Sequence, residues 1–145
     1  ILKKSDIITL HAPLMKSTYH LLNKKNKKLT KPGCYIINTS RGGLVEGEAL
    51  LKGLQSNHIA GAGLDVLEEE EIMRDPVLLF SGKCQECTIK NTLVNSMLID
   101  HPRTIVTPHN AFNTQEALEQ KASLSVEAVA CFFKKGVFPY PIPSV

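Results

Sequence analysis

Three kinds of polar residue follow short apolar runs in this sequence of 145 residues: arginine, glutamate and histidine. Arg41 follows CYIIN, a run of four glutamates at 68–71 follows IAGAGLDV, and His109 follows TIVT. A guanidinium binds anions through paired charge-assisted hydrogen bonds, and an imidazole exchanges protons near neutral pH. A carboxylate beside an imidazole stabilises its protonated form. Residues of these types can bind an anion and transfer a proton if the fold brings them together.

The elements that must position these residues are short strands separated by helices. Strands are predicted at Asp6–His11, Cys34–Asn38, Ile59–Val66 and Thr104–Thr107. Helices are predicted at 46–55 and 114–135, with two helical turns at most over 23–29. Continuous apolar strands alternating with helices indicate a parallel sheet buried on both faces, in a doubly wound α/β architecture. Ligands bind beyond the carboxyl ends of such strands, so an arginine, a carboxylate and a histidine are expected on one rim.

Two segments do not fit this alternation. Residues 72–103 show no clear long element and are rich in polar and turn residues, as in functional or inserted segments. The tail 137–145 contains three prolines and is expected to be extended.

Composition bounds the class of protein. Hydrophobic residues make up 43% and charged residues 21%, as in ordinary globular domains. The net charge of +3 does not by itself indicate nucleic-acid binding. No transmembrane span or signal peptide is visible, and the four cysteines are expected to be reduced thiols in a cytoplasmic protein. The chain lacks an initiator methionine and is interpreted as a fragment.

Other polar residues have plain interpretations. The lysines at 24–28 favour a solvated helix face over a phosphate site. Cys84 and Cys87 form a CxxC without a second pair, which makes a zinc site unfavoured, and no metal is predicted. His11 is expected to orient a loop, and His20 and His58 are expected at the surface.

Four motifs occur in a fixed order at the predicted strand ends: SDIITLHAPL, INTSRGGLV, GAGLDVLEEE and TPHNAF. Together they resemble the D-isomer-specific 2-hydroxyacid dehydrogenase family over nearly the whole chain, most weakly between 72 and 100. The stretch HNAFNTQEAL is most similar to the D-lactate dehydrogenase branch. The resemblance implies the distal half of a Rossmann-type NAD-binding domain at 1–113. Residues 114–145 would then be a C-terminal helix and an extended tail returning toward the substrate domain.

The same resemblance implies catalytic roles for Arg41, Glu70 and His109. Arg41 would bind the carboxylate of a 2-oxo acid, with a loop-capping arginine as the alternative. His109 would be the general acid in reduction and the base in reverse, with a core histidine as the alternative. Glu70 would pair with His109, although four consecutive glutamates leave Glu69 and Glu71 open for this role. The glutamates without this role are expected to be solvated.

The resemblance also implies NAD as the cofactor. The residues that match the family's cofactor contacts are Ala12, Pro13, Thr18, Thr39, Ser40, Arg41 and Asp65. Asp65 would accept a hydrogen bond from the nicotinamide carboxamide. The G-x-G-x-x-G turn that binds the pyrophosphate is absent, and Gly61-Ala62-Gly63 lies inside a predicted strand. The 145 residues are therefore expected to be inactive alone.

The resulting hypothesis is an NADH-dependent reductase that converts a 2-oxo acid, with pyruvate as the first expectation, to the D-2-hydroxy acid. Its partners would be this small molecule and a second copy in a homodimer, without nucleic acid or membrane. Two alternatives stay open: a dehydrogenase-derived binding module, as in corepressors that resemble the family, and a folding fragment inactive without the missing N-terminal half.

Overall fold

The computed structural model describes residues 1–75 and 86–140 and divides the chain into two compact units. The first unit is Ile1–His109 and the second is Asn110–Val145. The boundary between the two units falls directly after His109.

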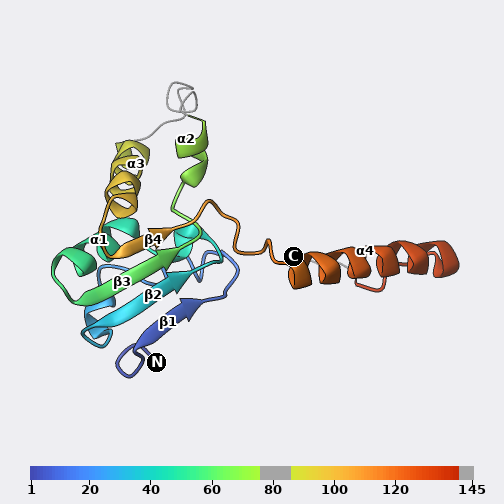
Figure 1. Cartoon of the computed structure of the whole chain (residues 1–145), viewed down its shortest axis with the longest axis horizontal. Helices are drawn as coiled ribbons and strands as arrows, with labels where there is room; N and C mark the ends of the chain where they lie inside the picture. Colours follow the sequence, from blue (N-terminus) through green and yellow to red (C-terminus); the bar gives the residue numbers. More distant parts are fainter. Residues whose placement is uncertain (76–85, 141–145) are drawn as a thin grey trace. The chain divides into compact units, whose positions relative to one another are not determined.

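A parallel sheet forms the centre of the first unit (Figure 1). Its strands are β1 (Ile7–Leu10), β2 (Cys34–Asn38), β3 (Ile59–Leu64) and β4 (Thr104–Val106). They are hydrogen-bonded in the order β1-β2-β3-β4, and every pair of neighbours is parallel. The predicted parallel α/β arrangement is confirmed. The residues of β2 are those predicted, and β1, β3 and β4 are shorter than predicted by one or two residues.

Helices connect the strands. They are η1 (Lys27–Leu29), η2 (Gly42–Leu44), α1 (Gly47–Gln55), α2 (Glu70–Arg74) and α3 (Glu86–Ile99). The predicted helix at 46–55 is confirmed as α1. The helical turns predicted over 23–29 shrink to the single 3-10 turn η1, because the Asn23 side chain accepts from the backbone N–H groups of Lys25 and Asn26. Such local side-chain bonds compete with helix formation.

The helix α3 corrects the prediction that 72–103 has no long element. Its sequence does not show the pattern of an amphipathic helix. Among its described side chains, Val94, Asn95 and Leu98 are buried, whereas the equally apolar Leu93 is 62% exposed. A buried asparagine beside an exposed leucine obscures the helical period from which a helix is predicted.

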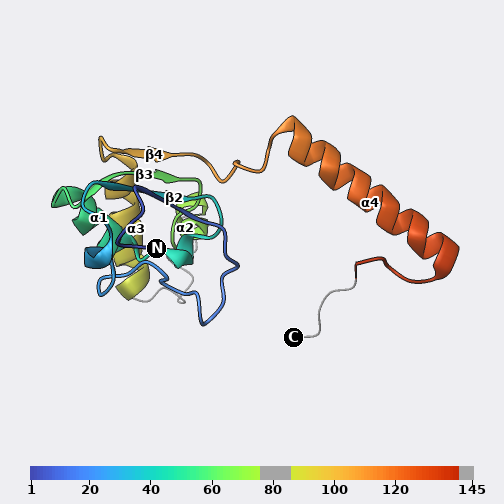
Figure 2. The same cartoon turned by 90° about the horizontal axis from the view of Figure 1, so that it is seen from below.

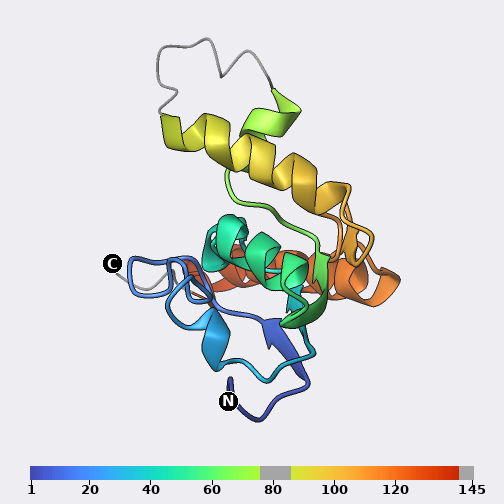
Figure 3. The ribbon, with the colours of Figure 1, turned by 90° about the vertical axis from the view of Figure 1, so that its left-hand side faces the viewer.

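The helices of the first unit cover one face of the sheet. Figure 2 shows α1 and α3 on the same side, and they pack against each other (Figure 3). On the other face Ile7, Tyr35 and Ile105 are 63%, 49% and 74% exposed within the chain. The predicted burial of the sheet on both faces is seen, within residues 1–109, on the face that the helices cover. The strand order never reverses here, so right-handed crossovers place every connecting helix on one side.

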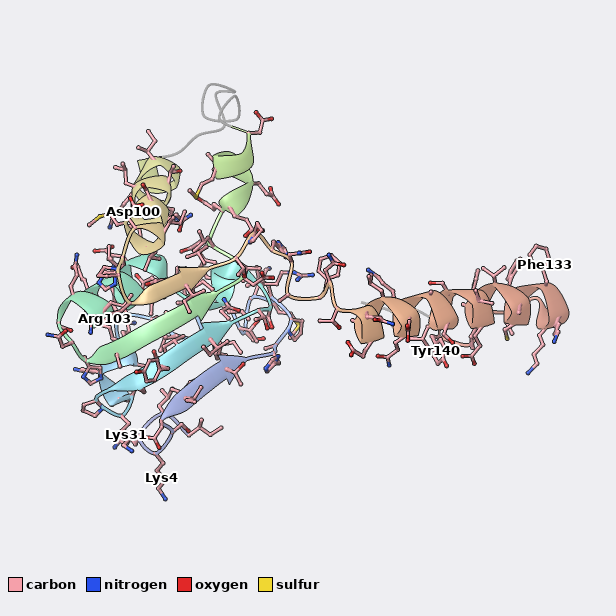
Figure 4. The ribbon with its side chains drawn as sticks, in the orientation of Figure 1. Lys4, Lys31, Asp100, Arg103, Phe133 and Tyr140 are labelled. Carbon is pink, nitrogen blue, oxygen red and sulfur yellow. The ribbon has the colours of Figure 1, made fainter. Side chains whose placement is uncertain are left out.

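The core lies between this sheet and α1. Ile36 and Ile59 from the sheet and Leu50 and Leu54 from α1 are almost completely buried. Arg103, which directly precedes β4 (Figure 4), donates a hydrogen bond to the carbonyl of Leu54 and ties the end of α1 to the last strand. Burial of these side chains stabilises the sheet that carries the polar loops.

The second unit is built on α4 (Gln115–Lys135). Thr114 caps its start by accepting from Ala117 N at 3.2 Å, and Gly136 ends it in the left-handed conformation, with φ 71°. After Gly136 the chain turns back, and the ring of Phe138 stacks on Phe132 at 4.8 Å. Tyr140 lies alongside the helix (Figure 4). Of the tail that was expected to be extended, residues 137–140 run back along α4, and 141–145 lie outside the described residues. In the described parts of both units, no helix has the length and apolar character needed to cross a membrane.

Ion pairs around Glu48 join α1 to two other segments. Its carboxylate contacts Lys52 on α1 at 2.7 Å, Lys90 on α3 at 2.5 Å and Lys24 at 2.9 Å. The hydrogen bonds from these three ammonium groups lower the pKa of Glu48 far below its ordinary value of 4.5. A carboxyl whose pKa is lowered in the folded state stabilises the fold above its unfolded pKa and loses that contribution as the pH falls.

We therefore predict that Glu48→Gln lowers the free energy of unfolding at pH 7 by roughly 1 kcal/mol, the upper range for partly exposed ion pairs. The difference from the unsubstituted chain should shrink as the pH falls below 4.5, the ordinary pKa of this group, toward its lower folded-state pKa. Urea unfolding at several pH values measures this. Glu119→Gln on α4, whose carboxylate bonds Gln115, is the matched control. A difference that is constant from pH 7 to pH 3 would contradict the prediction.

Candidate active site

The carboxyl ends of β2, β3 and β4 bring the three predicted catalytic residues to one depression. Arg41 follows β2, Glu70 begins α2 after β3, and His109 follows β4. The depression has a volume of about 430 Å³. It is lined by Leu14, Arg41, Gly42, Gly43, Val66, Leu67, Glu69, Glu70, Glu71 and His109. Parallel pairing of the strands is what makes their ends meet at this edge.

A short hydrogen bond joins the acid and the histidine. His109 Nδ1 lies 2.5 Å from Glu70 Oε1, and the two side chains are 32% and 20% exposed. The second carboxylate oxygen, Glu70 Oε2, accepts from Leu67 N at 3.0 Å. The carboxylate is thus held by its own loop and presented to the imidazole. A ring whose Nδ1 is engaged in this way has Nε2 as the nitrogen that can exchange a proton with a ligand.

The backbone of His109 is held in an uncommon conformation. Its φ is 55°, in the left-handed region that non-glycine residues rarely adopt. Its N–H donates to the carbonyl of Thr107 at 2.9 Å, which closes a tight turn after β4. Such a conformation costs of order 1 kcal/mol or more and persists where surrounding contacts enforce it, often at functional sites.

The four consecutive glutamates have different surroundings. Glu70 is the one that faces His109, whereas Glu69 is exposed and contacts Asn91 Nδ2 at 3.3 Å, and Glu71 is exposed as well. Glu68, which was expected to be solvated with the others, is instead only 7% exposed. The left-handed φ of Glu69 (53°) turns the chain between the first and the third glutamate, so their side chains reach different partners.

The partners of Glu68 correct a second expectation. His20 was predicted at the surface, but its Nε2 lies 2.6 Å from Glu68 Oε1 and its side chain is 25% exposed. Tyr19 Oη donates to the same oxygen at 2.9 Å. His58, also predicted at the surface, is half-buried beside Thr30 Oγ1 at 3.0 Å. His11 is exposed and contacts Thr9 Oγ1 at 2.8 Å.

Arg41 lies exposed at the edge of the depression. One of its N–H groups donates to the carbonyl of Ser40 at 2.7 Å, which orients the guanidinium. Within 1–75 and 86–140, no carboxylate forms an ion pair with Arg41. Its charge is therefore available for an anionic ligand, which it can hold through two parallel hydrogen bonds.

A second depression adjoins the first and has a volume of about 570 Å³. It is lined by His11, Ala12, Pro13, Leu14, Thr39, Ser40 and Arg41. Among the residues predicted to contact the cofactor, Ala12, Pro13, Thr39, Ser40 and Arg41 are here together. Because this depression shares Leu14 and Arg41 with the first, a ligand in one would lie beside a ligand in the other.

The other two predicted cofactor residues already bond within the protein. Thr18 Oγ1 donates to the Pro13 carbonyl at 2.7 Å and accepts from Met15 N at 2.8 Å, which shapes the loop. Asp65 is 3% exposed and accepts from Thr107 Oγ1 at 2.5 Å. Five of the seven predicted cofactor residues thus line one depression, whereas Thr18 and Asp65 form hydrogen bonds within the loops around it.

Sequence reasoning missed several residues of the site. Leu14 lines both depressions, Gly42 packs against the loop that carries Glu70, and Thr107 joins Asp65 to the turn before His109. The one signal for them was position, since each directly neighbours a predicted site residue or closes a strand. Their packing depends on contacts between loops that the sequence does not reveal.

The described residues hold no group of three His, Cys, Asp or Glu side chains arranged to bind a metal ion. Cys84 lies outside the described residues, and the side chain of Cys87 is likewise not described.

The parallel sheet, with a cationic side chain and an acid–histidine pair beyond its strand ends, defines a Rossmann-like α/β domain. The profile of the NAD binding domain of the D-isomer specific 2-hydroxyacid dehydrogenases matches residues 1–111. The chain belongs to this family, as the four motifs predicted, and NAD is the cofactor of this domain.

Relatives share this part of the fold. The chain is 38% identical over 136 residues to the aromatic 2-oxoacid reductase of Clostridium sporogenes, and 38% identical over 139 residues to the glyoxylate reductase of Thermococcus litoralis. It resembles the crystal structure of D-lactate dehydrogenase from Aquifex aeolicus, complexed with NAD and lactic acid, with a TM-score of 0.73 and 37% identity.

These alignments cover most of the chain but less than half of each relative. They include 94%, 96% and 99% of the chain against 39%, 36% and 43% of the three proteins, respectively. The chain therefore spans about two-fifths of the length of the relatives it matches.

We predict that Gly42→Ala separates the Arg41 loop from the Glu70 loop. A Cβ at this position would lie 2.0 Å from the backbone oxygen of Leu67, and backbone atoms cannot rotate away. The free energy of unfolding should fall by about 1–3 kcal/mol, as for other overpacked sites. Gly63→Ala is the matched control, because its Cβ would meet a methyl of Ile37 at 3.1 Å, which can yield. Urea denaturation of both variants decides. Equal stability of the two would contradict the predicted clash.

Proposed function

We propose that the protein containing these residues reduces a 2-oxo acid to the D-2-hydroxy acid with NADH. The observation that carries the proposal is the Glu70–His109 hydrogen bond beside Arg41 in one depression. The depression can thus offer an anion-binding group and a proton donor to the same small molecule. Family membership supports this reaction class.

Arg41 binds the carboxylate of the 2-oxo acid in this proposal. Two parallel N–H···O bonds fix the plane of the carboxylate and hence the face of the neighbouring carbonyl. The bond from the guanidinium to the Ser40 carbonyl limits its rotation before substrate arrives. A preorganised clamp converts binding energy into orientation of the reacting carbon.

His109 supplies the proton. When bound, NADH supplies the hydride for the carbonyl carbon. The protonated imidazole donates from Nε2 to the carbonyl oxygen as negative charge develops there, and this oxygen becomes the hydroxyl group of the product. Glu70 holds the ring through Nδ1 and so keeps Nε2 directed toward the substrate. In the oxidation direction the neutral ring accepts the alcohol proton.

The substrate side chain would contact Leu14, Val66 and Leu67, which line the depression. Pyruvate is the substrate we propose, because D-lactate dehydrogenases are prominent among the similar structures. The aromatic 2-oxoacid and glyoxylate reductases among the relatives show how far side-chain preference varies in this family. We also propose that the protein acts as a cytoplasmic homodimer. The 145 residues alone should be inactive, since they lack the glycine-rich phosphate turn.

We predict that His109→Gln in the complete enzyme lowers kcat for pyruvate reduction by about 10²–10⁴-fold, the usual contribution of general acid–base catalysis. The KM for NADH should change little, because the imidazole acts on the ketone oxygen, where charge develops in the transition state. Steady-state kinetics measures both. His58→Gln, at the other end of β3, is the matched control. Turnover near that of the control would exclude His109 as the proton donor.

We predict that Arg41→Lys instead raises the KM for pyruvate strongly. An ammonium is a point charge and cannot form the two parallel bonds that a planar carboxylate accepts. Arg103→Lys, which alters the arginine before β4, is the control for loss of a guanidinium elsewhere. The same kinetic assay with varied pyruvate applies, and an unchanged KM would remove Arg41 from substrate binding.

A further inference from the structure

A buried carboxylate outside the reacting groups connects the loops of the site. Glu68 is 7% exposed, and its Oε1 receives two donors, Tyr19 Oη at 2.9 Å and His20 Nε2 at 2.6 Å. A carboxylate taken out of water needs such partners, because burial without them is costly. Glu68 therefore fixes the loop after β3 to the segment after β1.

The segment that carries these two donors is itself attached to the Arg41 loop. His20 N donates to the Gly43 carbonyl at 2.8 Å, and Leu22 N donates to the Leu44 carbonyl at 3.0 Å. The rings of Tyr19 and His20 stack with centroids 3.9 Å apart. The left-handed backbone of His20, with φ 51°, turns its side chain toward Glu68 while its N–H stays on the Arg41 loop.

Glu68 is also held through its backbone. Asn95 of α3, 2% exposed, donates from Nδ2 to the Glu68 carbonyl at 2.7 Å. The next residue, Glu69, has the uncommon φ of 53°, and Glu70 follows with its contact to His109. A strained residue between two anchors keeps its conformation only while both anchors hold.

We propose that Tyr19, His20 and Glu68 are positioning residues that set the distance between Arg41 and the Glu70–His109 pair. The Tyr19–His20 segment contacts Gly43, two residues from Arg41, on one side and Glu68, two residues from Glu70, on the other. A substrate bound by Arg41 and protonated by His109 needs this separation fixed to a fraction of an ångström. The expected effect on turnover rests on the proposed reduction, whereas the expected effect on the distance between Arg41 and the Glu70–His109 pair does not.

The test uses the double variant Tyr19→Phe/His20→Phe of the full chain, labelled with ¹⁵N-histidine. This variant removes both donors to Glu68 and keeps two aromatic rings that can stack. Freed from Glu68, the loop should let Glu70 withdraw from His109, so the ring ¹⁵N shifts of His109 should move toward those of Glu70→Gln. Tyr19→Phe alone should give a smaller shift in the same direction. His58→Phe, the matched control, should leave the His109 shifts unchanged. Unchanged His101 signals in the double variant, compared with the parent chain, report an intact fold.

The complete enzyme provides the second readout. The double variant should lower kcat for pyruvate by about 10- to 100-fold, the scale of a misplacement of about 1 Å, with the KM for NADH unchanged. A second double variant, Tyr19→Phe/His20→Gln, keeps an N–H donor at the histidine position and should therefore lose less activity than the first. If the folded Tyr19→Phe/His20→Phe variant has the same His109 ring ¹⁵N shifts as the parent chain, the proposal is overturned. If the parent enzyme is inactive but the double substitution still changes the His109 ring ¹⁵N shifts, the reductase function is refuted and the positioning role is supported.

Discussion

The contact between Glu70 and His109 depends on two loops that are 39 residues apart in sequence and meet because β3 and β4 are parallel neighbours. In an antiparallel pair, the residue after one strand would lie at the opposite edge from the residue after the other. The parallel register places Leu64 beside Val106, and the hydrogen bond from Thr107 N to the Leu64 carbonyl continues the ladder to the start of both loops. The geometry of the acid–histidine pair is thus an extension of the sheet.

Strained backbone is concentrated around this edge. His20, Glu69 and His109 are non-glycine residues with φ between 51° and 55°, and each lies in a loop at the carboxyl ends of the strands. Each costs of order 1–3 kcal/mol. The cost is offset locally, because the side chains of His20 and His109 each contact a glutamate and the backbone of Glu68 is held by Asn95. The polar bonds of the site therefore also maintain the conformations that create it.

Features that depend on neighbouring residues in the sequence could be predicted, whereas features that depend on contacts between distant residues could not. The strands are apolar runs, and Arg41 and His109, each three residues after a strand end, were placed correctly at one edge. The helix α3 escaped prediction because tertiary burial of Asn95, a poor helix former, outweighs its local preference. The burial of Glu68 and His20 also depends on a distant contact. Each is the partner of the other, 48 residues away, and no neighbouring residue in the sequence indicates this pairing.

The two faces of the sheet in residues 1–109 differ in how far their side chains are buried. The sheet face beneath α1 and α3 holds the apolar core, whereas the opposite face carries exposed Ile7, Tyr35 and Ile105. The edge that carries Arg41, Glu70 and His109 does not depend on that second face, since its hydrogen bonds come from loops that end on the covered side or on the sheet itself. Arg41, Glu70 and His109 can therefore be ordered by residues 1–109 before any pyrophosphate anchor is added. The glycine-rich turn, absent from these residues, would add cofactor affinity to a site whose Glu70–His109 contact is already in place.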